Sequence, residues 1–245
     1  GTMTNIQTET ETPPWAPTED DLPDSDGMPL DNERQAVQIS LLAQPAKRHF
    51  ADRADVYVGA NMFVYFSPDQ VLTEDFRGPD VFVVTGTTKR ERKSWVTWQE
   101  GKGPDLVIEI LSESTQRTDR TLKKEIYATR LRVPEYFWYD PFSGERAGFI
   151  LHGSEYLPLE PDTHDGLPSR QTGLTLVRWH GIVEDIEATW LRWATSDGVL
   201  IPTADEAEQS QRQRVERAEQ SVAELEARLA QYQQRFGIEP GSNVP

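Results

Sequence analysis

Residues 104–141 read PDLVIEILSESTQRTDRTLKKEIYATRLRVPEYFWYDP, and this stretch decides the fold expected for the chain. Its first part, 106–111, is a short apolar run interrupted by one acid, which is typical of a strand buried on both faces. The middle, 113–131, has the polarity of a half-exposed helix. Pro134 ends the helical pattern, and the aromatic residues 136–139 predict a second strand. The stretch therefore predicts a strand, a helix and another strand in succession.

One acid, Glu109, lies in the middle of the first apolar run. A buried carboxylate is costly unless a cation compensates it, so a metal ion or a lysine is expected beside it. Lys123 and Lys124 follow within the predicted helix, and Asp80 begins another expected strand, GPDVFVV. Asp105 shares a strand face with Glu109 but lies four residues, or about 13 Å, away, which makes it the weaker candidate for a metal ligand.

These residue types can carry a hydrolytic metal site. Two carboxylates on neighbouring strands, Asp80 and Glu109, can hold a hard divalent cation such as Mg²⁺ or Mn²⁺, and the peptide oxygen of Ile110 can complete the ligand set. The ammonium group of a lysine would stabilise charge that develops on a phosphate. Structural roles are the alternative: a Pro-Asp pair can cap a turn, Glu109 can form a salt bridge with Lys123, and the lysines can belong to a solvated helix face.

The composition excludes several other functions. The sequence has no cysteine, which excludes disulfides, thiol nucleophiles and zinc–thiolate sites and makes a reducing cytoplasm the expected location. No apolar run is long enough to span a membrane, so no membrane partner is expected. The four histidines do not have metal-ligand spacing, and no phosphate-binding glycine loop or serine–histidine–aspartate order is present.

The net charge of −16 at first opposes nucleic-acid binding, because phosphate contacts need lysine and arginine. The acids are unevenly distributed, however. Residues 1–29 hold seven acids and no base, whereas residues 30–200 hold 26 acids and 20 bases. A local basic face is therefore compatible with the sequence, although the overall charge does not predict one.

Three segments are expected along the chain. Residues 1–29 are rich in Thr, Pro, Asp and Glu and predict a flexible acidic leader, in which Trp15 is the only large anchor. Residues 30–200 are long enough for one globular α/β domain. Residues 201–245 predict a separate helix followed by a short tail.

Within the domain, the first helix is expected to be capped by Asp31 or Asn32 and to end before Pro45. After the central stretch, short antiparallel strands joined by Gly- and Asp-containing turns are expected. Residues 189–193 are compatible with either a short helix or a strand.

From about residue 204 the sequence becomes rich in Glu, Gln, Arg and Ala, and its apolar residues recur in heptads. One core position of the heptad holds Val215, Val222, Leu229 and Phe236, and the other holds Ala218, Leu225 and Tyr232. This pattern predicts a coiled-coil helix that ends at Gly237. Two arrangements are open: the helix pairs with a second copy in a homodimer, or it folds back onto the domain.

A resemblance adds to these inferences. The run PDLVIEILSES, followed by Asp119, Lys123, Tyr127 and then VPEYFWYDP, resembles the signature of the Uma-two family of restriction-endonuclease-like proteins, in the PD-(D/E)XK nuclease superfamily. The resemblance extends from about residue 31 to about residue 193, and the heptad tail is similar to one that many members carry. It implies an α/β fold with a restriction-endonuclease-like mixed β-sheet core flanked by helices, followed here by the C-terminal coiled-coil helix.

The resemblance also implies roles for individual residues. Asp80 would be the first acid of the site and Glu109 the second. The superfamily places its lysine two residues after the second acid, where this chain has Leu111. The resemblance therefore suggests a lysine in the following helix, Lys123, which forms the family's Lys-x-x-x-Tyr pattern with Tyr127. Four accessory candidates complete the set: Lys124 in place of Lys123, Glu33 from the first helix, Asp105, and Asp119, which would orient Lys123 or cap the helix.

Two functions of different classes follow. The leading expectation is a Mg²⁺- or Mn²⁺-dependent endonuclease that hydrolyses DNA phosphodiesters as a homodimer, with RNA not excluded as a substrate. The alternative is a catalytically silent protein that retains the nuclease fold and assembles through its coiled-coil tail. The two differ in whether Asp80, Glu109 and a lysine converge on one cation.

Overall fold

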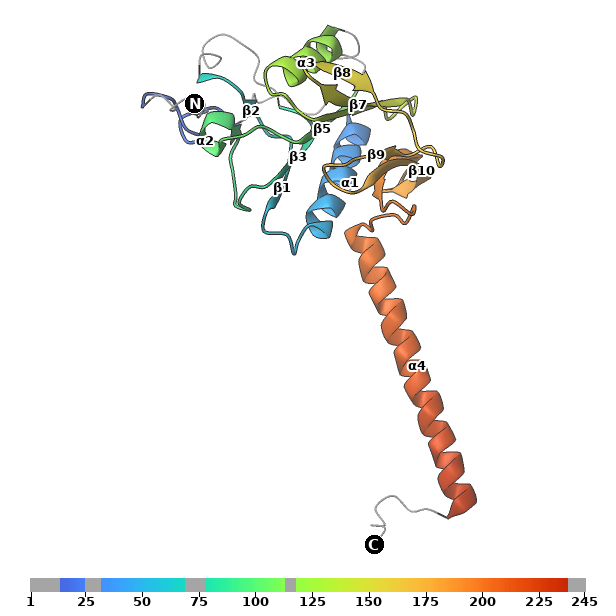
Figure 1. Ribbon diagram of the computed structural model, residues 1–245. Helices are drawn as coiled ribbons and strands as arrows, with labels where there is room; N and C mark the ends of the chain where they lie inside the picture. The colour runs from blue at the N-terminus through green and yellow to red at the C-terminus, as the bar shows by residue number, and fades with distance from the viewer. Residues whose placement is uncertain (1–13, 25–31, 69–77, 113–117, 238–245) are drawn as a thin grey trace, which may run out of the picture. The chain divides into compact units, whose positions relative to one another are not determined.

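The computed structural model describes residues 14–24, 32–68, 78–112 and 118–237 (Figure 1). Contacts within the chain divide it into two units, Gly1–Ile201 and Pro202–Pro245, and each is described by itself. Within the described residues, no helix combines the length and the apolar character that crossing a membrane requires.

The order of the elements follows the expected strand–helix–strand pattern at the centre of the chain. The first unit contains the helices α1 (Glu33–His49), α2 (Thr97–Glu100) and α3 (Thr118–Thr129). Its strands are β1 (Val56–Ala60), β2 (Val64–Tyr65), β3 (Val81–Thr85), β4 (Trp95–Val96), β5 (Leu106–Ile110), β6 (Glu135–Tyr139), β7 (Arg146–His152), β8 (Glu155–Pro158), β9 (Leu167–Pro168), β10 (Thr175–Val183) and β11 (Ile186–Ala194). The second unit contains α4 (Ala204–Phe236).

The main sheet has six strands in the order β1-β3-β5-β6-β7-β8. Strands β5 and β6 are parallel, whereas the other neighbouring pairs are antiparallel. A parallel pair needs a crossover connection, and α3 provides it. The expected α/β class with a mixed sheet and flanking helices is therefore confirmed.

Alternation along the central strands gives this sheet two apolar faces. On one face, Ile108 of β5 packs in a cluster with Leu42 of α1. On the other face, Val107 packs in a cluster with Tyr127 of α3. Figure 1 shows α1 and α3 on opposite sides of the sheet. Because successive strand residues point to opposite faces, Glu109 points to the same side as Val107, which is the side of α3.

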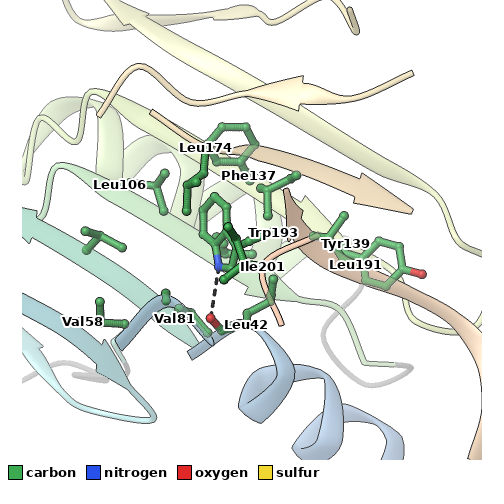
Figure 2. Close-up of a cluster of buried hydrophobic side chains, with 14 of the residues drawn as sticks. Leu42, Val58, Val81, Leu106, Phe137, Tyr139, Leu174, Leu191, Trp193 and Ile201 are labelled. Atoms are coloured by element: carbon green, nitrogen blue, oxygen red, sulfur yellow. Dashed lines mark hydrogen bonds between the residues drawn. The ribbon is translucent and has the colours of Figure 1, made fainter. Parts of the chain in front are cut away.

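Helix α1 lies between the main sheet and a second sheet of order β11-β10-β9. The indole N–H of Trp193 in β11 donates a hydrogen bond to the carbonyl oxygen of Leu42 (3.0 Å; Figure 2). The side-chain amide of Gln38 bonds both backbone groups of Leu191, donating to its carbonyl and accepting from its N–H, each at 2.9 Å. These contacts fix α1 against β11.

The helix α1 begins as expected but ends later than expected. The side chain of Asn32 accepts a hydrogen bond from the backbone N–H of Gln35 (2.9 Å), which is an N-cap. The expected end before Pro45 is wrong, because the helix continues to His49. A proline inside a helix removes one hydrogen bond. Pro45 and the following Ala46 are buried, and their burial offsets that loss.

Residues 14–24 differ from the flexible leader expected over 1–29. Leu22 is buried in a cluster with Tyr65, so this part of the leader contacts the domain. Trp15, which was expected to be the anchor, is 66% exposed, and Leu22 has that role instead. The remaining residues of the predicted leader lie outside the described ranges.

Strands β10 and β11 form a long hairpin, in which nine residues of each strand are paired. The sequence predicts only short strands in this region and is compatible with either a helix or a strand over residues 189–193. The turn contains Glu184 and Asp185, which have φ angles of 48° and 64°. Two successive left-handed residues suit a tight hairpin turn, but Glu-Asp is a weaker sequence signal than Asn-Gly.

Candidate active site

The strand register brings Asp80 and Glu109 together. Strands β3 and β5 are antiparallel, with Val81 opposite Ile108. Continuing this register by one residue places Asp80 opposite Glu109. The backbone N–H of Ile110 donates a hydrogen bond to Oδ2 of Asp80 (2.6 Å), and the charge of Glu109 acts on the carboxyl group of Asp80. The two acids predicted from the sequence therefore meet at the C-terminal end of β5.

Helix α3 adds two polar groups to this pair. The Nζ atom of Lys123 lies 3.0 Å from Oε2 of Glu109. The hydroxyl of Tyr127 donates a hydrogen bond to the other carboxylate oxygen, Oε1. Because residues four apart lie on the same face of a helix, one face of α3 presents both groups to Glu109. The residue two positions after Glu109 is Leu111, so the lysine that contacts this acid comes from the helix and not from the strand.

Burial and like charge dominate the electrostatics of the site. Glu109 is 5% exposed, whereas Asp80 is half-buried. Burial and the neighbouring charge of Glu109 raise the pKa of Asp80 to about 8, although the nearby Lys123 opposes this shift. Burial also raises the pKa of Tyr127 well above its ordinary value, so its hydroxyl remains protonated and can donate. A bound cation would relieve the repulsion between the two acids.

Gln35 was not among the predicted site residues, but it reaches the same end of β5. Its Nε2 atom donates a hydrogen bond to the carbonyl oxygen of Ile110 (3.2 Å), and the residue is buried. Glu33, the acid expected from this helix, is exposed in the first turn of α1. A signal for Gln35 was present in the sequence, because Gln35, Gln38 and Leu42 have the spacing of one buried helix face.

The other accessory candidates have different surroundings. Asp105 lies at the opposite end of β5, where its carboxylate pairs with Lys102 (2.8 Å). The Nζ atom of Lys124 lies 3.7 Å from the centre of the Phe149 ring, which is a cation–π contact. Asp119 lies in α3, but its side chain is outside the described part of the structure. Asp105 and Lys124 therefore each have a structural partner.

The oxygen atoms at the end of β5 fit a hard divalent cation. Asp80 and Glu109 lie opposite each other on neighbouring strands, and the carbonyl of Ile110 belongs to the residue that bonds Asp80. Mg²⁺ is commonly held by one or two carboxylates together with waters and substrate phosphates. No group of three or more acidic or histidine side chains suited to a metal ion occurs among the residues that the structure describes.

Comparison with known proteins gives a family for the chain. The model of the family Uma2, described as "Putative restriction endonuclease", matches residues 26–179, which is more than half of the chain. Four chains of solved structures match. One is a crystal structure of a "putative nuclease belonging to DUF820 from Anabaena variabilis"; it is 17% identical, the match covers 63% of this chain and 90% of that chain, and the TM-score is 0.42. No curated protein matches.

Proposed function

We propose that this chain, which belongs to the Uma2 family of restriction-endonuclease-like proteins, is a metal-dependent endonuclease that hydrolyses phosphodiester bonds in DNA. The observation that carries the proposal is the convergence of Asp80, Glu109 and Lys123 at one end of β5. Two neighbouring acids favour a divalent cation between them, and the lysine offers a positive charge to a phosphate. A cytoplasmic setting is part of the proposal, because the sequence contains no cysteine.

Asp80, Glu109 and the carbonyl group of Ile110 would hold Mg²⁺ or Mn²⁺. When bound, the ion would polarise a phosphoryl oxygen and lower the pKa of an attacking water. The protein fixes the proposed ligands before substrate arrives. Tyr127 and Lys123 each bond one carboxylate oxygen of Glu109, and the N–H of Ile110 bonds Asp80. Ligands held in this way need little reorganisation during the reaction.

Lys123 would act on the substrate. Its side chain is 20% exposed, whereas that of Glu109 is 7% exposed, so the lysine is the more accessible member of the pair. Its ammonium group would donate hydrogen bonds to the phosphate of a bound nucleic acid and stabilise the negative charge that develops in the transition state. The contact between Lys123 and Glu109 supports the assignment of the catalytic lysine to Lys123.

A second copy of the chain is the proposed protein partner. Hydrolysis of both strands of a DNA duplex is simplest with two sites in one assembly. The helix α4 carries an exposed apolar seam with heptad spacing, which suits pairing with another copy.

The proposal is tested with the variants Glu109→Ala and Glu109→Gln. The full chain is incubated with plasmid and with single-stranded DNA in Mg²⁺ or Mn²⁺. We expect the wild-type protein to cleave DNA and both variants to lose at least about a hundredfold in rate. Thermal unfolding of Glu109→Gln, which keeps the shape of the side chain, serves as the folding control. Wild-type cleavage rates in Glu109→Ala, or cleavage that persists in EDTA, would contradict the proposal.

A catalytically silent interaction protein is the second candidate, and the net charge of −16 favours it. Calorimetric titration with Mn²⁺ separates the two candidates. If the chain is a nuclease, the wild-type protein should bind the ion, and Asp80→Asn should bind it at least about tenfold more weakly. A wild-type protein that neither binds Mn²⁺ nor cleaves DNA would support the silent protein.

A further inference from the structure

The helix α4 presents a continuous apolar seam to solvent. Six large residues of the seam are between 46% and 63% exposed: Val215, Val222, Leu225, Leu229, Tyr232 and Phe236. The seam covers three heptads, a length of about 30 Å along the helix. Single exposed apolar residues are common, but an apolar row with heptad spacing is the signature of a surface that pairs with another helix.

The residue types in the seam favour a two-stranded coiled coil. In the heptad notation, position a holds Val215, Val222, Leu229 and Phe236, and position d holds Ala218, Leu225 and Tyr232. The central heptad, with Val222 and Leu225, combines a β-branched residue at a with leucine at d. A β-branched residue at a with leucine at d is the combination that favours parallel dimers. At the end of the seam, the rings of Tyr232 and Phe236 are stacked, with their planes 10° apart. These two rings would close the seam at its C-terminal end.

The charges beside the seam select the orientation of the two helices. In a parallel pair in register, each residue at position g faces position e of the next heptad in the other helix. Arg214 at g would then face Glu219 of the second copy, and Arg228 at g would face Gln233. Neither contact brings like charges together. The first contact occurs twice in a symmetric dimer and pairs opposite charges.

An antiparallel pair would bring like charges together. If the seam is kept in contact by packing Val215 against Tyr232 of the second copy, positions g face g and positions e face e. Arg214 would then face Arg235, and Glu219 would face Glu226. Each of these contacts also occurs twice. The flanking residues therefore oppose the antiparallel arrangement as well as supporting the parallel one.

We infer that α4 pairs with α4 of a second copy as a parallel, in-register, two-stranded coiled coil that begins near Val215. The polypeptide connects the Gly1–Ile201 unit to the N-terminal end of α4, so both such units would leave the coiled coil at the same end. The pairing needs neither a metal ion nor cleavage, so it can hold even if the proposed nuclease activity fails.

Cysteine cross-linking of the full chain tests the orientation, because the protein has no cysteine of its own. We expect Val215→Cys to form disulfide-linked dimers under mild oxidation, since position 215 meets its own copy only in the parallel register. Gln220→Cys, on the opposite side of the same helix, is the matched control and should remain largely uncross-linked. Cross-linking only in a mixture of Val215→Cys and Tyr232→Cys would overturn the inference in favour of antiparallel helices.

Charge exchange gives an independent test by analytical ultracentrifugation. Arg214→Glu should weaken dimerisation about fivefold, because two attractive contacts become repulsive. The double variant Arg214→Glu, Glu219→Arg should restore the wild-type affinity. Stronger dimerisation of Arg214→Glu would overturn the parallel arrangement, because that change relieves the Arg214–Arg235 repulsion of an antiparallel pair. A wild-type protein that is monomeric at all concentrations, or trimeric, would overturn the inference as well.

Discussion

The neighbouring residues Lys123 and Lys124 have different partners, which makes them a matched pair for mutation. Lys123 contacts Glu109, whereas Lys124 lies over the ring of Phe149. We expect Lys123→Ala to lower kcat for DNA cleavage at least about a hundredfold. Lys124→Ala should change kcat less than about threefold and lower the free energy of unfolding by about 0.5–1 kcal/mol. Single-turnover cleavage and denaturant unfolding measure the two effects, and equal losses of kcat would contradict the assignment of Lys123.

Glu135 gives a prediction about pH. It is 2% exposed and accepts hydrogen bonds from the hydroxyl of Ser169 (2.5 Å) and the backbone N–H of Arg170 (2.7 Å). Burial raises the pKa of Glu135 above its ordinary value, although these hydrogen bonds oppose the shift. A group whose pKa is higher in the folded state contributes most to stability below its unfolded pKa, and this contribution is lost as pH rises through the folded pKa.

The variant Glu135→Gln isolates this contribution, because a neutral amide replaces the carboxyl group. We expect the free energy of unfolding of the wild-type protein, relative to the variant, to fall as pH rises from about 4 towards neutral. Urea titrations at a series of pH values measure the difference. A difference that stays constant, or that grows with pH, would show that the charged form of Glu135 is not disfavoured in the folded protein.

At the residue scale, the sequence drew attention to Asp80 and Glu109, which the structure brings together, but not to Gln35. Glu109 was identifiable because a carboxylate inside a buried strand needs a compensating partner. Gln35 was not identified, although it contacts Ile110. Its contact depends on α1 crossing the end of β5, which is a tertiary arrangement that helix periodicity cannot provide. Periodicity shows that Gln35 is on a buried face and leaves open what that face meets.

At the element scale, Gln38 links α1 to β11. It is fully buried, and its amide satisfies both backbone groups of Leu191. We expect Gln38→Leu to lower the free energy of unfolding by about 2–4 kcal/mol, because it leaves a buried N–H and a buried carbonyl without their partner. Ser40→Ala, an exposed position on the same helix, should change it by less than about 0.5 kcal/mol. Urea unfolding measures the free energy of unfolding of both variants. Similar losses in the two would contradict the structural role of Gln38.

The elements that the sequence placed incorrectly are those in which packing overrides local preference. Pro45 is a helix breaker by its backbone chemistry, yet α1 continues to His49 because the surrounding turn is buried. Glu184 and Asp185 form the turn of the β10–β11 hairpin without the glycine that usually marks such a turn. By contrast, β5, α3 and β6 were predictable, since two short apolar or aromatic runs flank a segment with helical polarity and Pro134 ends the helical region.

At the scale of the whole molecule, part of the acidic leader is paired with basic residues of the domain. Glu19 contacts Arg90 (2.7 Å), and Asp20 contacts Lys93 (2.7 Å). The Asp20–Lys93 pair is mostly exposed, so it contributes little to stability. These two pairs offset the charges of Arg90 and Lys93 locally, so part of the negative charge of the leader is compensated by the domain.

Deletion of residues 204–245 tests whether pairing of two copies determines how DNA is cut. The deletion keeps Ile201, which is buried in the core cluster, and removes only α4 and the tail. We expect the truncated protein to be monomeric by light scattering and to nick plasmid DNA at a rate within about threefold of wild type, because the candidate site lies wholly outside the deleted segment. Linear plasmid should then accumulate only after nicked circles, because each strand is cut in a separate encounter.

The full-length variant Leu225→Glu is the matched control for this deletion, since it places a charge in the seam of α4 and leaves the chain length unchanged. Like the truncated protein, Leu225→Glu should produce nicked circles before linear plasmid. Gln220→Glu, on the outer face of the helix, should cut plasmid as the wild-type protein does. If the truncated protein is monomeric and still converts supercoiled plasmid directly to linear product, a single copy cuts both strands. The coiled coil would then serve assembly and have no part in the cleavage pattern.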